Sequence, residues 1–329
     1  MITQKPFVSA SRGLWSSRAD AVAQPVLGIA LVMLAAALWG TVGVATQLVT
    51  ASRFLSDTVF GIARMLLGGP AILLVVVLAK RGVLSSVLML DPVKLMAFVT
   101  ACAVFQVSLF RSFALLGVTS AVFLTVCLPP VFGCGWALIR RTQPVSRGAA
   151  GALGLAVAGI GTFAWSRFSA DTLEQITVGL AFAILASVAF VVMTSAARDL
   201  TQACGPMIVV GVGLTLSGAL LVVALPVIET QALQVSALAD WQVLGLLLYL
   251  GLAPTALAYL AYCSGTARCR SANVGLIATM VEPAIAAVLA WLLLHEKLLP
   301  GEWAGCFMVS VAMLLLWWSE QRKRNMLSD

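Results

Sequence analysis

Glu282 and Pro283 stand side by side in the middle of an apolar run that covers residues 271–294. A charged side chain at such a depth in hydrocarbon costs about 2.5–3.5 kcal/mol on insertion scales, and a proline removes one hydrogen bond from a helix. Three roles are open for Glu282. It takes up and releases a proton, it receives the ammonium group of a ligand, or it donates and accepts hydrogen bonds that hold a broken helix.

Arg64 and Arg111 lie inside apolar runs, away from the ends of the runs, and both are possible partners of Glu282. Arg111 shares a helical face with Ser108, three residues before it. Two roles are open for Arg111. Its guanidinium binds the carboxylate of a ligand through two parallel hydrogen bonds, or its head reaches the membrane surface while its stem stays buried.

Three further residues carry polar or aromatic groups at depth. Gln106 and Tyr259 lie 153 positions apart in two different apolar runs, and each is able to hydrogen-bond a ligand or a neighbouring helix. Trp39 lies near the middle of the first run, away from the interfaces where Trp usually anchors a membrane protein. We expect Trp39 to gate a pathway or to stack on an apolar or aromatic ligand.

The composition excludes a water-soluble globule, because 61% of the 329 residues are hydrophobic, only 10% are charged and the mean hydropathy is +1.04. Soluble domains are about a quarter charged. Each apolar run is near the roughly 20 residues that span a bilayer as a helix. The ten runs are 26–48, 58–79, 93–116, 119–139, 147–165, 177–197, 206–227, 240–264, 271–294 and 302–318.

The basic residues indicate the orientation of these spans. With ten spans, 15 of the 20 Lys and Arg residues fall on the side of the N-terminus and three on the opposite side. The positive-inside rule then places both termini in the cytoplasm. The net charge of +7 is therefore explained by topology, which argues against a nucleic-acid partner. The N-terminal 25 residues have no small-residue cleavage site, so the first span is expected to stay as an anchor.

The chain reads as two copies of a five-helix unit. Pro130 in the fourth run and Pro283 in the ninth share the offset of 153 residues, as do Ser120 and Asn273. Five spans are an odd number, so the second copy enters the membrane upside down. Inverted repeats with paired helix breaks are typical of proteins that bind a solute near the bilayer midplane. Two prolines inherited as packing kinks remain the alternative.

Several stretches together resemble the EamA branch of the drug/metabolite transporter superfamily. They are LAAALWGTVGVA with Trp39, GIARMLLGGPAILL with Arg64, FALLGVTSAVFLTVCLPPVFGCGWAL, GLAPTALAYLAYCSGTARCRSANVGLIA and EPAIAAVLAWLLLHEKLLPGEWAG. The resemblance covers nearly everything from residue 26 to 318. The first half departs from the pattern at Gln143, where the second half has Glu296. In this family Arg64 falls in a peripheral helix, so the resemblance favours a structural role for it, with an ion pair as the candidate.

The resemblance implies an all-α polytopic membrane protein with ten transmembrane helices in two inverted five-helix repeats. It implies a secondary transporter that works by alternating access and exports amino acids or related small metabolites across the inner membrane of a prokaryote. The alternatives are proton-coupled efflux of amines or drugs and, remotely, an intramembrane enzyme. The expected segments are a cytoplasmic tail over 1–25, repeats over 26–165 and 177–318, an external loop over 166–176 and a basic cytoplasmic tail over 319–329.

We expect a small-molecule solute and the lipid bilayer as partners, with a homodimer as a further option. No catalytic role, cofactor or metal is expected, because the single His lies outside the spans and the seven Cys show no C-x-x-C spacing. The residues expected to line the pathway are Trp39, Gln106, Arg111, Pro130, Tyr259, Glu282 and Pro283.

Overall fold

A computed structural model describes residues 25–53, 57–79, 83–139, 147–167, 172–228, 240–268 and 273–328. These residues are helical, with short turns between them and no strand in the described part of the chain. The predicted N-terminal tail and Gln143 fall outside the described residues.

The described residues of the first half of the chain form seven helices. They are α1 (Pro25–Gly40), α2 (Val42–Arg53), α3 (Asp57–Ala79), α4 (Val83–Leu88), α5 (Pro92–Leu116), α6 (Val118–Ile139) and α7 (Arg147–Arg167). The second half begins with α8 (Leu173–Cys204) and α9 (Pro206–Ile228). It continues with α10 (Trp241–Gly251), the π-helix η2 (Leu252–Leu257), α11 (Ala258–Arg268), α12 (Asn273–Leu293) and α13 (Pro300–Ser328).

Six helical stretches in the described residues are long and apolar enough to cross a membrane. They are Val26–Leu48, Thr58–Ala79, Pro92–Leu116, Leu173–Thr201, Pro206–Pro226 and Trp241–Gly265. Large apolar side chains on these stretches face outward, among them Val26, Leu78 and Val223, which are 78–80% exposed. An apolar exterior of this kind is suited to hydrocarbon and not to water. The chain is therefore an all-α polytopic membrane protein.

Shorter apolar helices cover three more of the predicted spans, at Val118–Pro129, Ala150–Phe163 and Glu282–Leu293. The tenth predicted span, 302–318, falls on α13. The count of ten membrane crossings stays a prediction. Two predicted segments have different boundaries as elements: α8 begins at Leu173, inside the expected loop 166–176, and α13 continues through most of the expected tail 319–329.

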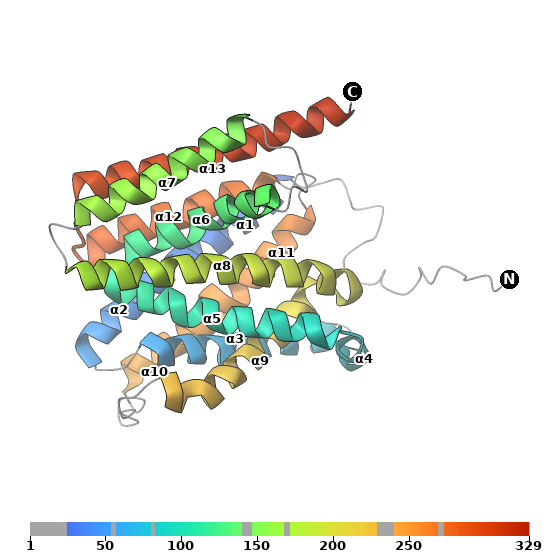
Figure 1. Cartoon of the computed structure of the whole chain (residues 1–329). Coiled ribbons are helices and arrows are strands. Elements are labelled where there is room, and N and C mark those ends of the chain that lie inside the picture. Colours follow the sequence, from blue (N-terminus) through green and yellow to red (C-terminus); the bar gives the residue numbers. More distant parts are fainter. Residues whose placement is uncertain are drawn as a thin grey trace.

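The helices pack in pairs from the two halves of the chain. α5 packs on α8, α3 on α9, and α7 on α13, while α1 contacts both α11 and α12 and α6 contacts α8 and α12. Figure 1 shows α7 and α13 side by side along one edge of the bundle and α3 with α9 toward the opposite edge.

Small residues allow α7 and α13 to approach closely. A Cβ on Gly305 would lie 2.6 Å from the carbonyl oxygen of Gly159, and one on Gly301 would lie 2.5 Å from Cβ of Ser166. The contact of α7 with α13 therefore uses Gly159. It does not use the glycines at 151, 154 and 161, since nothing lies within 4 Å of a Cβ built on any of them.

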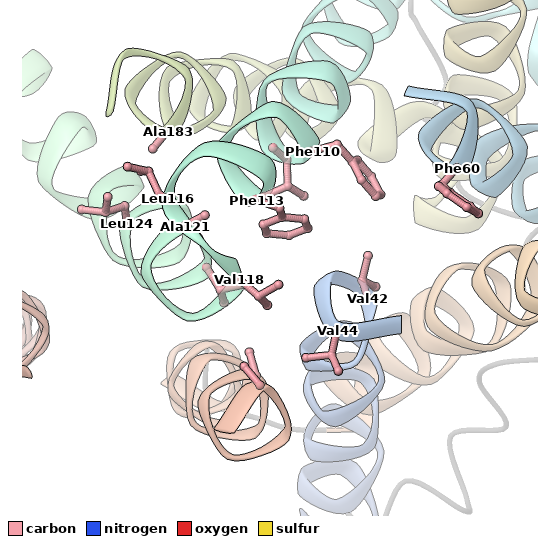
Figure 2. Close-up of a cluster of buried hydrophobic side chains, with 14 of the residues drawn as sticks. Val42, Val44, Phe60, Phe110, Phe113, Leu116, Val118, Ala121, Leu124 and Ala183 are labelled. Atoms are coloured by element: carbon pink, nitrogen blue, oxygen red, sulfur yellow. The ribbon is translucent and has the colours of Figure 1, made fainter. Parts of the chain in front are cut away.

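A core of apolar side chains lies where α5 turns into α6. Phe110, Phe113 and Leu116 of α5 and Val118 of α6 are buried here together with Val42 of α2. Figure 2 shows these side chains converging from helices that are far apart in the sequence. The turn itself is at Gly117, whose φ of +79° is a conformation that L side chains rarely adopt.

Two membrane helices are interrupted at their middles, and the interruptions touch. α1 and α2 meet at Thr41, whose hydroxyl lies 2.6 Å from the hydroxyl of Tyr249 on α10. α10 then passes into the π-helix η2, which contains Pro254. The sequence predicts a break at Pro254. The structure adds the break at Thr41 and the contact between the two helices.

Candidate functional site

Aromatic side chains from α1 and α11 meet beside the π-helix. The ring of Trp39 lies 5.3 Å from that of Tyr259 in an edge-on arrangement and 5.4 Å from that of Tyr262. Two of the predicted pathway residues, Trp39 and Tyr259, are thus in direct contact. Edge-on pairs at this separation are favourable for aromatic rings, so the contact stabilises the positions of the Trp39 and Tyr259 rings.

Arg64 of α3 crosses to the π-helix. Pro254 has no N–H, so the helix cannot complete its regular bonding there, and the hydroxyl of Thr255 donates to the carbonyl oxygen of Leu250 at 2.8 Å. Nε of Arg64 donates to the same hydroxyl oxygen at 2.7 Å, and its Nη2 lies 3.5 Å from the carbonyl oxygen of Pro254. The guanidinium thereby ties α3 to the irregular segment.

Glycines bring these two elements together. A Cβ on Gly68 would lie 2.4 Å from Cγ2 of Thr255 and 2.9 Å from the carbonyl oxygen of Gly251. In turn, a Cβ on Gly251 would lie 2.4 Å from Cβ of Leu67. The close approach is possible only because neither position carries a side chain, and it sets Arg64 at bonding distance from η2.

Gln106 of α5 is 3% exposed, and its side chain packs against Gly61, one turn before Arg64 on α3. Among the described residues, Nε2 of Gln106 has no hydrogen-bond partner, and neither does Nε1 of Trp39. A buried donor left without an acceptor costs about 1–3 kcal/mol. Both atoms belong to residues singled out from the sequence, and both would gain from an acceptor that is not part of the protein.

Glu282 lies on α12, directly before the buried Pro283. Its backbone is close to α1, since a Cβ on Gly40 would lie 2.7 Å from the carbonyl oxygen of Glu282. Its carboxylate interacts electrostatically with Arg64 and with Tyr259. No hydrogen bond to the carboxylate is formed within the described residues.

These contacts define the Arg64 cluster, which consists of Trp39, Arg64, Gln106, Tyr259 and Glu282. Each member comes from a different part of the chain: α1, α3, α5, α11 and α12. The bundle is otherwise strongly apolar, so the convergence of a cation, an acid, an amide and two aromatic rings marks the candidate site.

Three of the residues predicted from the sequence to line the pathway are not members of the Arg64 cluster. Arg111 lies on α5 beyond Gln106 and is partly exposed. Pro283 lies inside α12, which continues as one helix from Asn273 to Leu293, so the break expected beside Glu282 is not formed. Pro130 lies on α6, and its side chain is outside the described residues. Of the two arginines, Arg64 is the one that interacts with Glu282.

A second group of polar residues, at the start of α6, was not predicted from the sequence. The carboxylate of Glu296 accepts from the backbone N–H of Thr119 at 3.3 Å and from its hydroxyl at 2.9 Å. Oε1 of the same carboxylate fills the space where Gly117 would carry a Cβ. An acid at a helix N-terminus satisfies free N–H groups and complements the helix dipole.

Glu302 reinforces this arrangement and is only 2% exposed. It accepts from the hydroxyl of Ser120 at 3.3 Å and from the backbone N–H of Leu299 at 2.6 Å. We call Glu296, Glu302, Thr119 and Ser120 the α6 cap. The pair Thr119–Ser120 after a glycine is a sequence signal for the start of a helix. The two acids that bind this pair, Glu296 and Glu302, lie about 180 residues later in the chain.

Metal ligation finds no support in the described residues, where no group of three or more His, Cys, Asp or Glu side chains could hold an ion. The described cysteines Cys102, Cys127, Cys204, Cys263 and Cys306 are free thiols. Cys102, Cys127, Cys204 and Cys306 are buried among apolar side chains, which is typical of packing residues.

Comparisons with known proteins show what the chain is similar to. A solved structure titled "Crystal structure of protein" is similar with a TM-score of 0.61 and 15% identity, over 88% of this chain and 96% of that chain. This likeness shows a shared fold. A search of curated proteins found no match. Residues 177–318 match the model of the EamA-like transporter family. Over its second half the chain is therefore similar to the EamA-like transporter family, part of the drug/metabolite transporter superfamily, and this similarity supports a membrane transporter.

Proposed function

We propose that the protein is a secondary transporter that exports amino acids or related small metabolites by alternating access. The observation that carries the proposal is the Arg64 cluster, where a cation, an acid and two donors without acceptors meet inside an apolar bundle. A small solute with both charges would complement these groups. The distribution of basic residues along the sequence favours both termini in the cytoplasm, and the resemblance to the EamA branch implies the cytoplasmic membrane of a prokaryote.

The pairing of helices supports two repeats, 26–165 and 177–318. Exchanging the halves turns the contact of α5 with α8 into that of α11 with α1, and the contact of α6 with α8 into that of α12 with α1. The contacts α3–α9, α7–α13 and α6–α12 map onto themselves. This is the pattern that a pseudo-twofold axis produces, and rocking of the halves about it would expose the cluster to each side in turn.

The proposed transport function gives roles to four members of the cluster. Trp39 and Tyr259 contact the apolar part of the solute, and Gln106 donates to an oxygen of it. Glu282 receives an ammonium group or a coupling proton. Pro283 and Pro130 lie at matching positions of α12 and α6, inside helices that continue through them. Arg111 remains the sequence-based candidate for a second contact, farther along α5.

The test is transport by the purified protein in proteoliposomes. The panel contains labelled amino acids, their decarboxylated amines and hydrophobic cationic drugs, each with and without a pH gradient. We expect saturable transport of amino acids. Transport of amines and drugs alone, driven by the gradient, would replace this proposal with proton-coupled efflux of cations. No transport of any of these solutes would overturn both.

Glu282→Gln, in inverted vesicles, separates the two roles of the acid. Full proton-driven uptake by this variant would exclude coupling through Glu282. Loss of the dependence on the gradient, with solute binding kept, would assign the coupling proton to it.

A further inference from the structure

Arg64 is a buried cation whose hydrogen bonds go to neutral groups. It is 8% exposed, and within the described residues its two bonds reach the Thr255 hydroxyl and the Pro254 carbonyl. A guanidinium has five N–H donors, so most of them remain available. Burial of a charge without a bonded counter-ion is costly unless the charge is satisfied in some state of the protein.

The two bonds occupy one edge of the guanidinium. Nε and Nη2 face Thr255 and Pro254, and this edge is therefore held by the π-helix. The opposite edge, formed by Nη1 and the second N–H of Nη2, makes no hydrogen bond to the described residues. That edge has the spacing that a carboxylate accepts through two parallel bonds.

The charges around this free edge are few. The groups that interact electrostatically with Arg64 are Tyr259, Glu282 and Cys102. Tyr259 and Cys102 are neutral near pH 7 by their ordinary chemistry. Glu282 is therefore the acid among these groups that interacts with the guanidinium of Arg64. The two form no hydrogen bond with each other within the described residues, and a ligand that bound both would need an anionic and a cationic group.

We propose that Arg64 receives the carboxylate of a zwitterionic solute on its free Nη edge, and that Thr255 is the positioning residue that aims it. The ammonium group of the solute pairs with Glu282, and its side chain lies against Trp39 and Tyr259. The inference rests on the proposed transport function and deepens it. It moves the carboxylate contact from Arg111 to Arg64, which the sequence had assigned to structure.

Thr255 acts through its hydroxyl. That group donates to Leu250 and accepts from Arg64 at the same time, so it fixes the plane of the guanidinium as well as the π-turn. Thr255→Val removes the hydroxyl at nearly constant volume, whereas Thr255→Ser keeps it. The matched control is Thr125→Val on α6, another buried threonine whose hydroxyl donates to a backbone carbonyl, that of Ala121.

The experiment measures binding to the purified full chain in detergent. The probes are an aromatic amino acid, its methyl ester, its decarboxylated amine and its analogue without the ammonium group. With the wild type we expect the ester and the amine to bind at least tenfold more weakly than the amino acid. Thr255→Val should weaken binding of the amino acid about threefold to tenfold and leave that of the ester unchanged, and Thr255→Ser should restore it.

Arg64→Lys adds a second reading, since a lysine keeps the charge and loses the paired donors. We expect it to reduce the preference for the amino acid over its ester. Binding of the ester by Arg64→Lys shows that this variant is folded, and if it does not fold, the Thr255 pair decides the question alone.

The outcomes separate the inference from the function on which it rests. If amino acids are transported but ester and amine bind as tightly as the amino acid, the role of Arg64 is refuted and the transport function stands. Equal losses in Thr255→Val and Thr125→Val would refute the positioning role of Thr255. If no amino acid binds or is transported by the wild type, the proposed function fails and the inference with it.

Discussion

The Arg64 cluster and the α6 cap both place carboxylates inside the protein, but they use them in opposite ways. In the cap, Glu296 and Glu302 accept hydrogen bonds from hydroxyls and backbone N–H groups. In the cluster, Glu282 accepts none within the described residues, and two neighbouring residues carry donors without acceptors.

The difference teaches which acid serves stability and which serves binding. An acid whose bonding capacity is met by its own chain has nothing left for a solute, and its removal exposes helix N–H groups. An acid left without bonds in an apolar bundle lowers stability in the empty protein and gains only when another group arrives. Variants in the cap should therefore change stability, and variants in the cluster should change transport.

Gly117→Ala should give the largest effect on the stability side. The new Cβ meets a backbone with φ of +79° and the space that Oε1 of Glu296 occupies. We expect a loss of about 2–4 kcal/mol, from backbone strain and the weakened cap together. Thermal unfolding in detergent measures it. A variant of wild-type stability with weakened solute binding would break the distinction between the two regions.

Glu282→Gln should give the largest effect on the transport side. Solute affinity should fall tenfold to a hundredfold, equivalent to about 1.4–2.8 kcal/mol, because the amide cannot pair with an ammonium group. The unfolding temperature should stay the same or rise, since a charge without bonded partners is removed. Saturation curves in proteoliposomes give the affinity. A large loss of thermal stability would assign Glu282 to the structure instead.

Trp39→Phe should have a smaller effect. The change keeps an aromatic ring against Tyr259 but removes the N–H that has no acceptor. We expect affinity for the solute to fall about threefold to tenfold, with stability unchanged or slightly raised. The control is Trp241→Phe, at a side chain that is 77% exposed. Equal effects of the two variants on affinity would show that the indole N–H of Trp39 makes no contact with the solute.

Glu296→Gln should have the smallest effect. The amide oxygen still accepts from Thr119, while the negative charge at the start of α6 is lost. We expect a decrease in stability of about 0.5–1 kcal/mol, the size of a charge interaction with a helix terminus, and unchanged transport. High salt should reduce the difference from the wild type. Changed solute specificity would bring the cap into the binding site.

Much of the fold is readable from hydropathy alone. Each apolar run lies on a helix, because an uninterrupted apolar stretch of this length in lipid has no other way to satisfy its backbone. Pro254 predicted a break and the structure has a π-helix there. Which small residues of α7 pack closely is decided by the structure, where Gly159 meets α13 and the glycines at 151, 154 and 161 meet nothing within 4 Å.

The candidate site contains residues that the sequence singled out, but the contacts between these residues were not predictable from it. Trp39, Gln106, Tyr259 and Glu282 stood out because each is costly or unusual at depth in lipid. Arg64 received a structural role, since nothing in the local sequence relates α3 to a π-helix some 190 residues later. The close approach of α3 to the π-helix depends on Gly68 and Gly251. In the sequence alone, these two glycines look like ordinary packing residues of membrane helices.

The sequence by itself determined that the chain resides in a membrane, which segments are helical and which polar groups lie at depth, because these follow from the cost of placing each residue in hydrocarbon. Only the tertiary structure decided which of these groups meet. It joined Arg64 to Thr255, brought it within electrostatic range of Glu282, and placed Glu296 and Glu302 at the start of α6. Contacts between distant segments depend on how helices pack, and packing is set by the shapes of many side chains at once.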